Sequence, residues 1–139
     1  MPPRSALLAV LFLAACHHGT AATDAAAAAA GPAIGAHEAL RFSGTEPFWS
    51  GEAADGTLTW HSPEHPDGER IAVTRFDGRN GVGYSGMLGG QPFQLAASAV
   101  PCRDGMSGSL YPFAVTVQLG AKTLRGCGWS DRHPSRNPR

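Results

Sequence analysis

Apolar and polar residues alternate along most of this chain, and the clearest alternation runs from Tyr111 to Leu119. Every second residue of this stretch shares one face: Tyr111, Phe113, Val115, Val117 and Leu119 on one side, and Pro112, Ala114, Thr116 and Gln118 on the other. A period of two over this length is typical of an antiparallel strand with one buried face. We therefore predict a strand here, with its large apolar side chains in the core.

The same alternation, interrupted by turn residues at short intervals, predicts more strands on either side. We expect them over residues 38–44, 48–53, 57–61, 69–76 and 82–88, around Phe93 and Leu95, and over 122–129. Asp55-Gly56, residues 77–81 and Gly89-Gly90 are turn signals, and residues 62–68, with two prolines, are expected to form a polar loop. About seven or eight strands without a helical period predict an all-β domain over residues 37–130, either a small antiparallel barrel or a sandwich.

The start of the chain has the pattern of a bacterial lipoprotein signal. A cationic Arg4, an apolar run over residues 6–15 and the sequence Leu13-Ala14-Ala15 directly before Cys16 describe an export signal. The run is too short for a transmembrane helix, which needs about 20 apolar residues. We predict that residues 1–15 are a signal peptide and that Cys16 is lipidated as the first mature residue. An ordinary secretory signal with an unrelated cysteine is the alternative.

The residues around the predicted domain favour a tethered protein. Residues 16–36 are rich in alanine and have no apolar stripe, so we expect the lipidated cysteine to be followed by a spacer. His17 favours an outer-membrane anchor on the periplasmic side, because aspartate at that position directs retention in the inner membrane of enteric bacteria. Residues 131–139 contain two prolines and no apolar side chain, and they are expected to be a disordered tail.

The charge of the predicted domain and its cysteine content indicate which partners and which covalent bonds to expect. Residues 37–130 contain seven basic and nine acidic side chains, so no basic face suited to nucleic acid is expected. No cofactor motif is present either. Of the three cysteines, Cys102 and Cys127 remain once Cys16 is assigned to lipid, and a disulfide between them persists in an oxidising compartment. Closing such a loop stabilises a small domain by on the order of 3 kcal/mol. Two free buried thiols are the alternative.

Two stretches contain the side chains best suited to binding. In residues 44–49, Glu46 precedes a proline, and Phe48 and Trp49 point to opposite faces, so one of the two is expected in the core. In residues 102–112, Asp104-Gly105 predicts a turn whose shape is held by local hydrogen bonds. The candidate binding residues are Glu46, Phe48, Trp49, Asp104, Met106, Ser107 and Tyr111.

These stretches resemble an uncharacterised family of bacterial envelope proteins, many of them lipoproteins. The family has a GTEPFW segment and, later, a C-x-DGMS…YP…G-x-x-L-x-GC pattern. The matching residues are 44–49, Cys102, 104–107, Tyr111, Pro112, Gly120, Leu124, Gly126 and Cys127. Gly108 stands where related sequences often have a charged residue. The resemblance covers most of residues 40–129 and implies an envelope location, but it brings no established activity.

The interpretation that these features favour is a non-catalytic binding or envelope-maintenance module. It is attached to the membrane by its lipid, with an envelope protein or a glycan as partner. One alternative is a periplasmic hydrolase that uses Asp104 with Ser107 or with Glu46. Another is metal binding by His61 and His65. A third is a lysozyme-inhibitor-like protein, because residues 82–86 are similar to a segment of those small barrels.

The predicted lipidation can be checked on the exported protein. Mass spectrometry should find a chain that begins at Cys16 and carries covalently bound lipid, because the residues before the cysteine match the cleavage pattern. Cys16→Ser should abolish both the modification and membrane attachment. An unmodified N-terminus, or cleavage at another residue, contradicts the assignment.

Overall fold

The computed structural model describes residues 33–137, which form a closed eight-stranded antiparallel barrel. The all-β prediction is confirmed, and the architecture is the barrel and not the sandwich. The predicted signal peptide, Cys16 and most of the alanine-rich spacer lie outside the described residues. No helix among residues 33–137 is long and apolar enough to span a membrane.

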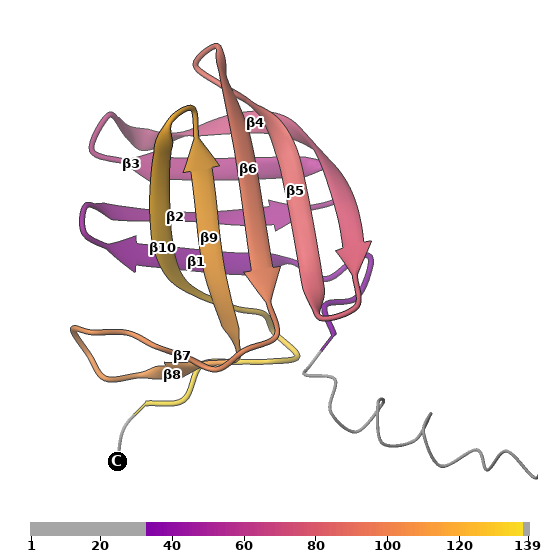
Figure 1. Cartoon of the computed structure of the whole chain (residues 1–139), viewed down its shortest axis with the longest axis vertical. Helices are drawn as coiled ribbons and strands as arrows, with labels where there is room; N and C mark the ends of the chain where they lie inside the picture. The colour runs from indigo at the N-terminus through magenta and orange to yellow at the C-terminus, as the bar shows by residue number, and fades with distance from the viewer. Residues whose placement is uncertain (1–32, 138–139) are drawn as a thin grey trace, which may run out of the picture.

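The barrel is a meander in which each barrel strand pairs with the next barrel strand along the chain, β6 with β9 included. The ten strands are β1 (Leu40–Thr45), β2 (Phe48–Ala54), β3 (Thr57–Ser62), β4 (His65–Gly78), β5 (Gly81–Leu88), β6 (Gln91–Ser98), β7 (Cys102–Arg103), β8 (Leu110–Tyr111), β9 (Phe113–Leu119) and β10 (Lys122–Trp129). The short strands β7 and β8 form a separate hairpin between β6 and β9, outside the ring. Pairing of β10 with β1 closes the barrel. The strands around β2 cross the direction of those around β9 (Figure 1).

Large aromatic side chains fill the barrel interior. Trp49 on β2 stacks on Trp60 on β3, with 5.4 Å between ring centroids and 18° between ring planes. Phe93 on β6 meets Trp60 edge-on, also at 5.4 Å. Alternate residues along the strands are buried: Leu40, Phe42, Leu58, Val82, Tyr84, Leu88, Leu95, Val115 and Val117. Leu119, which was predicted to share the inward face of β9, is only partly buried against this core. Stacked and edge-on pairs add to the stabilisation from area burial alone.

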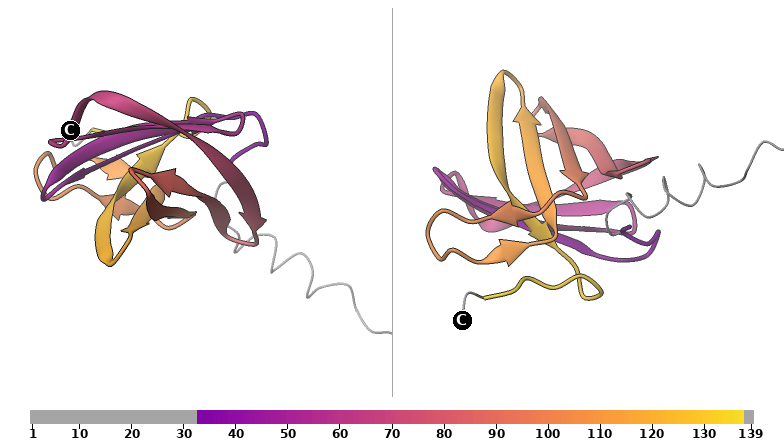
Figure 2. Two further views of the ribbon diagram at one scale, coloured as in Figure 1. Left: turned by 90° about the horizontal axis from the view of Figure 1, so that it is seen from above. Right: turned by 60° about the horizontal axis from the view of Figure 1, so that its bottom comes forward.

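Strand β4 replaces the polar loop expected over residues 62–68, so that prediction is wrong. Only Pro63 and Glu64 form a turn, and Ser62 already pairs with His65. The first half of β4 pairs with β3, and the second half, from Val73, pairs with β5. Proline is tolerated in strands that lack a neighbour on one side, which is the situation of Pro66. One long strand therefore turns the corner between the two halves of the barrel, as seen from above in Figure 2.

The segment after β10 is also different from its prediction. Instead of a disordered tail, residues 131–137 lie along the end of the barrel. The amide of Leu110 donates to the carbonyl of Arg136 at 2.9 Å, and the amide of Arg136 donates back at 2.7 Å. The Asp131 carboxylate accepts a hydrogen bond from Arg41 at 2.6 Å. Backbone pairing orders this segment, and a polar sequence without apolar residues does not reveal such pairing.

Strand β9 begins two residues later than predicted. Phe113 is its first residue, whereas Tyr111 pairs with Cys102 in the β7–β8 hairpin. Pro112, which has no amide hydrogen to donate, separates the two elements. Tyr111 therefore leaves the inward-facing row to which its position in the alternation assigned it.

Two glycines allow the Trp49 ring to lie against the barrel wall. A Cβ on Gly44 of β1 would come within 2.3 Å of the ring, and one on Gly126 of β10 would come within 2.9 Å. The same Cβ on Gly126 would lie 2.1 Å from the carbonyl oxygen of Ser43. The indole N–H of Trp49 is buried without a hydrogen-bond partner among the described residues. Close packing is thus what holds this side chain in place.

Replacing Gly126 tests this packing. Gly126→Ala should lower the free energy of unfolding by about 3 kcal/mol, because the added methyl group meets a backbone oxygen that cannot move alone. Gly83→Ala is the matched control, since its Cβ would find no atom closer than 3.6 Å. The control should change stability by less than about 0.5 kcal/mol in urea denaturation. Equal effects of the two substitutions would show that the wall does not depend on Gly126.

Candidate functional site

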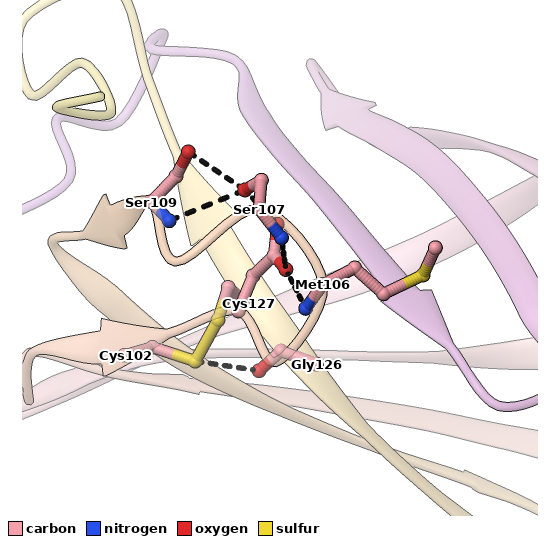
Figure 3. The surroundings of a disulfide bond; sticks show 7 residues. Cys102, Met106, Ser107, Ser109, Gly126 and Cys127 are labelled. Carbon is pink, nitrogen blue, oxygen red and sulfur yellow. Dashed lines mark hydrogen bonds between the residues drawn. A yellow bond between two sulfur atoms is a disulfide. The ribbon is translucent and has the colours of Figure 1, made fainter. Parts of the chain in front are cut away.

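A disulfide fixes the β7–β8 hairpin against the outside of β10. Cys102 of β7 and Cys127 of β10 are bonded, with 5.5 Å between their Cα atoms, so the predicted pairing is confirmed. Leu124 is buried in the interior and Arg125 is exposed, so the alternation along β10 places Cys127 on the outer face. Cys127 is nevertheless buried, because the hairpin covers it. The sulfur of Cys102 also lies 3.3 Å from the carbonyl oxygen of Gly126 (Figure 3). The hairpin is therefore held to the strand that closes the barrel.

Asp104 organises the loop between β7 and β8. One carboxylate oxygen accepts hydrogen bonds from the amides of Met106 and Ser107, at 2.6 and 2.8 Å. The other accepts one from the Ser107 hydroxyl at 2.6 Å. These bonds from Ser107 and Met106 stabilise the carboxylate and lower the pKa of Asp104. Asp104 and Ser107 thus shape the loop from within.

The surroundings of Ser107 do not resemble those of a catalytic serine. Its oxygen lies 2.7 Å from the Ser109 hydroxyl and accepts the Ser109 amide at 3.2 Å. A nucleophilic serine requires a general base that accepts its proton, most often histidine. In the part of the chain that the structure describes, no histidine hydrogen-bonds to Ser107; its partners are Asp104 and Ser109. This arrangement suits a rigid turn.

The two sequence stretches meet at a shallow groove beside this loop. Thr45 is the last residue of β1 and Glu46 follows in the β1–β2 turn. Gly105 and Met106 come from the hairpin loop, and Thr123, Leu124 and Arg125 come from β10. The groove has a volume of about 670 Å³. Figure 3 shows the Met106 side chain extending away from the disulfide. Residues 46 and 106 are thus brought together by the closure of β1 onto β10.

Two exposed apolar side chains border this groove. Met106 is 80% exposed, and Phe48, which pairs with Thr45 in the β1–β2 ladder, is 64% exposed. We call the surface formed by Thr45, Glu46, Phe48, Met106 and Arg125 the Phe48–Met106 surface. Sequence reasoning missed Thr45 and Arg125, which face outward on β1 and β10. The alternation of β10 could have indicated Arg125, since it lies two residues before Cys127.

The remaining candidate residues lie elsewhere. Trp49 is only 1% exposed and belongs to the core, as expected for one of the two adjacent aromatics. Tyr111 packs against Trp129, with 5.4 Å between ring centroids, away from the groove lining. Burial, together with the nearby Asp104 carboxylate, raises the pKa of Tyr111. Of the seven predicted residues, Glu46, Phe48 and Met106 share one surface.

The two candidate metal ligands are engaged separately. His65 Nδ1 lies 3.0 Å from the Glu69 carboxylate. The His61 ring packs beside Gly68, whose Cβ would lie 2.5 Å from it. Among residues 33–137 no group of three or more His, Cys, Asp or Glu side chains is placed to hold a metal ion. The structure thus provides no complete ligand set around His61 and His65.

The role of Asp104 can be tested by amide hydrogen exchange. Asp104→Ala should accelerate exchange at Met106 and Ser107, because both amides lose their acceptor, whereas Asp104→Asn should have a smaller effect because it keeps a carbonyl oxygen. Because the pKa of Asp104 is lowered on folding, its contribution is present at neutral pH and is lost as the pH falls below the usual value of an aspartic acid. Unchanged exchange in Asp104→Ala, with the fold intact, would contradict this role.

The chain was compared with known protein families, curated proteins and solved structures. No known protein family, curated protein or solved structure was found to match this chain. The resemblance to the envelope family therefore depends on its motif residues alone.

Proposed function

We propose that the protein is a lipid-anchored, non-catalytic binding module at the outer membrane, and that it binds an envelope protein through the Phe48–Met106 surface. The observation that carries this proposal is the exposure of two large apolar side chains on separate elements: Met106 lines the groove, and Phe48 pairs with Thr45, which also lines it. Aromatic residues, methionine and arginine are enriched in the centres of protein interfaces. The Cys16 signal and the envelope-family resemblance support the location.

The backbone that carries Phe48 and Met106 is held in place, which favours binding without a conformational change. Phe48 begins β2, which is paired along its length with β1. Met106 lies in a loop held by Asp104 and by the disulfide at Cys102. A preorganised surface loses less conformational entropy when a partner binds. Glu46 and Arg125, which have opposite charges, lie in the same groove and provide orientation for a partner with complementary charges.

The filled interior favours the outer surface as the binding site. The cavity at the barrel mouth, floored by Trp49 and Trp60, has a volume of about 220 Å³. Pockets that enclose drug-sized ligands have volumes of about 300–1,000 Å³. The stacked tryptophans and Phe93 occupy the space that a wider barrel uses for a ligand. Recognition of a macromolecule on the outside is the function that this geometry favours.

Site-specific photocrosslinking in intact cells tests the proposal. A photoreactive amino acid at position 48 or at position 106 should capture the same envelope protein. The matched control is position 76, because Phe76 is also an exposed aromatic, at 56%, but it pairs with Gly83 of β5 and not with a residue of the groove. Phe48→Ser should weaken capture from position 106 about tenfold, the loss expected from truncating an interface hot spot.

The outcomes distinguish specific binding at the Phe48–Met106 surface from non-specific capture by any exposed apolar side chain. Phe48 and Met106 are exposed, so their replacement should leave thermal unfolding unchanged. Equal capture from position 76, different partners at positions 48 and 106, or no capture from either would contradict the proposed surface.

A further inference from the structure

A second pocket lies at the end of the barrel where residues 131–137 pass the β7–β8 hairpin. Its walls are mainly apolar and include Pro101, Tyr111, Pro112 and Pro134. Its volume is about 470 Å³, within the range of about 300–1,000 Å³ that is usual for small-molecule sites. Figure 2, in the view with the lower end brought forward, shows the hairpin and the final segment beside each other below the barrel.

Contacts on each side hold this pocket open. The paired amides and carbonyls of Leu110 and Arg136 join its two walls, and Ser109 hydrogen-bonds to Asn137 at 3.3 Å. The His133 ring meets Phe113 edge-on, with 5.8 Å between centroids. Tyr111 is positioned by its packing on Trp129. The pocket is therefore largely preformed, as small-molecule sites usually are.

The ionisable side chains that line this pocket, apart from Tyr111, are two arginines and one histidine. Arg132, His133 and Arg136 line it, and no acidic side chain does. In the described part of the chain, neither guanidinium group forms a hydrogen bond or an ion pair. Two arginines without internal partners at the edge of an apolar pocket favour an anionic ligand, since a guanidinium group binds a carboxylate through two parallel hydrogen bonds.

The carboxylates near this pocket are bound by groups other than Arg132 and Arg136. Glu38, whose side chain is 7% exposed, accepts hydrogen bonds from the Ser130 hydroxyl and from the Gly35 amide, and it lies 3.5 Å from His133. Burial alone would raise the pKa of Glu38, but these hydrogen bonds and the nearby His133 and Arg132 lower it, so Glu38 stays ionised. Asp131 is bound by Arg41. Arg132 and Arg136 are therefore left to interact with a ligand, because the carboxylates nearby bind other groups.

We propose that this pocket binds a small organic anion, with an apolar body of roughly a dozen non-hydrogen atoms that ends in a carboxylate. The body lies against Tyr111 and the prolines, and the carboxylate accepts hydrogen bonds from Arg132 and Arg136. The pocket shares no lining residue with the groove of the Phe48–Met106 surface. Binding at this pocket can therefore be tested independently of the proposed function.

Three matched probes test the charge requirement: 4-phenylbutyrate, the neutral 4-phenylbutanol and the cationic 4-phenylbutylamine. Each is titrated into the ¹⁵N-labelled full-length protein and followed by two-dimensional NMR. The butyrate should shift amide signals of Leu110, Tyr111 and residues 132–136, and it should bind about tenfold more tightly than the alcohol, the gain expected from hydrogen bonds to a charged group. The amine should not bind at this site.

Substitution of the arginines supplies the second test. Arg132→Gln combined with Arg136→Gln should weaken butyrate binding about tenfold, to the level of the alcohol. Arg79→Gln is the matched control, because Arg79 is an exposed arginine in the β4–β5 turn and does not line the pocket. The amide spectrum of each free variant reports directly whether its fold is retained.

Several results would overturn the proposal. They are equal binding of acid and alcohol, equal effects of the double and control variants, and amide shifts confined to residues near Phe48 and Met106. A protein that ignores the soluble butyrate but binds vesicles containing phosphatidylglycerol would identify a lipid surface as the partner, and this too overturns the proposal.

Discussion

The barrel depends on the packing of Trp49 between its stacking partner Trp60 and the two glycines of the wall. An eight-stranded barrel has an interior just wide enough to be filled by side chains. Gly44 and Gly126 lie on β1 and β10, the two strands whose pairing closes the ring. A side chain larger than hydrogen at either glycine would push the indole away from the wall. The same contact therefore fills the core and allows closure.

Closure of the ring determines what lies on the outside. Because β10 pairs with β1, the outer face of β10 stands beside the β1–β2 turn. The disulfide at Cys127 then places the β7–β8 hairpin on that face, with Met106 near Glu46. Asp104 keeps the loop in shape through its own amides, so the hairpin needs no further core of its own. A surface of residues distant in sequence results from one closing strand pair.

The far end of the barrel is closed by polar contacts. Arg75 donates hydrogen bonds to the carbonyls of Ile34 and Gly35, which ties the entering chain to β4. Glu38 joins the same entering segment to Ser130 and His133 after the last strand. These buried or half-buried groups satisfy one another, as buried polar groups must to avoid a desolvation cost. They also set the charge balance beside the pocket at Arg132 and Arg136, so the contacts that order the chain ends also give this pocket its positive character.

Local pattern in the sequence determined most of the barrel strands and which of their faces turn inward. Alternation such as Val82-Tyr84 or Phe113-Val115-Val117 depends only on the period of an extended chain, and the pairing of Cys102 with Cys127 followed from the cysteine count. The tertiary structure alone decided that the sheet closes as a barrel, that β4 continues past Pro66, and that Arg136 pairs with Leu110. It alone placed Glu46 beside Met106 and moved Tyr111 out of its predicted row. The physical reason is that these outcomes depend on which strands become neighbours and on hydrogen bonds between backbone groups, and every residue except proline offers the same backbone donor and acceptor whatever its side chain.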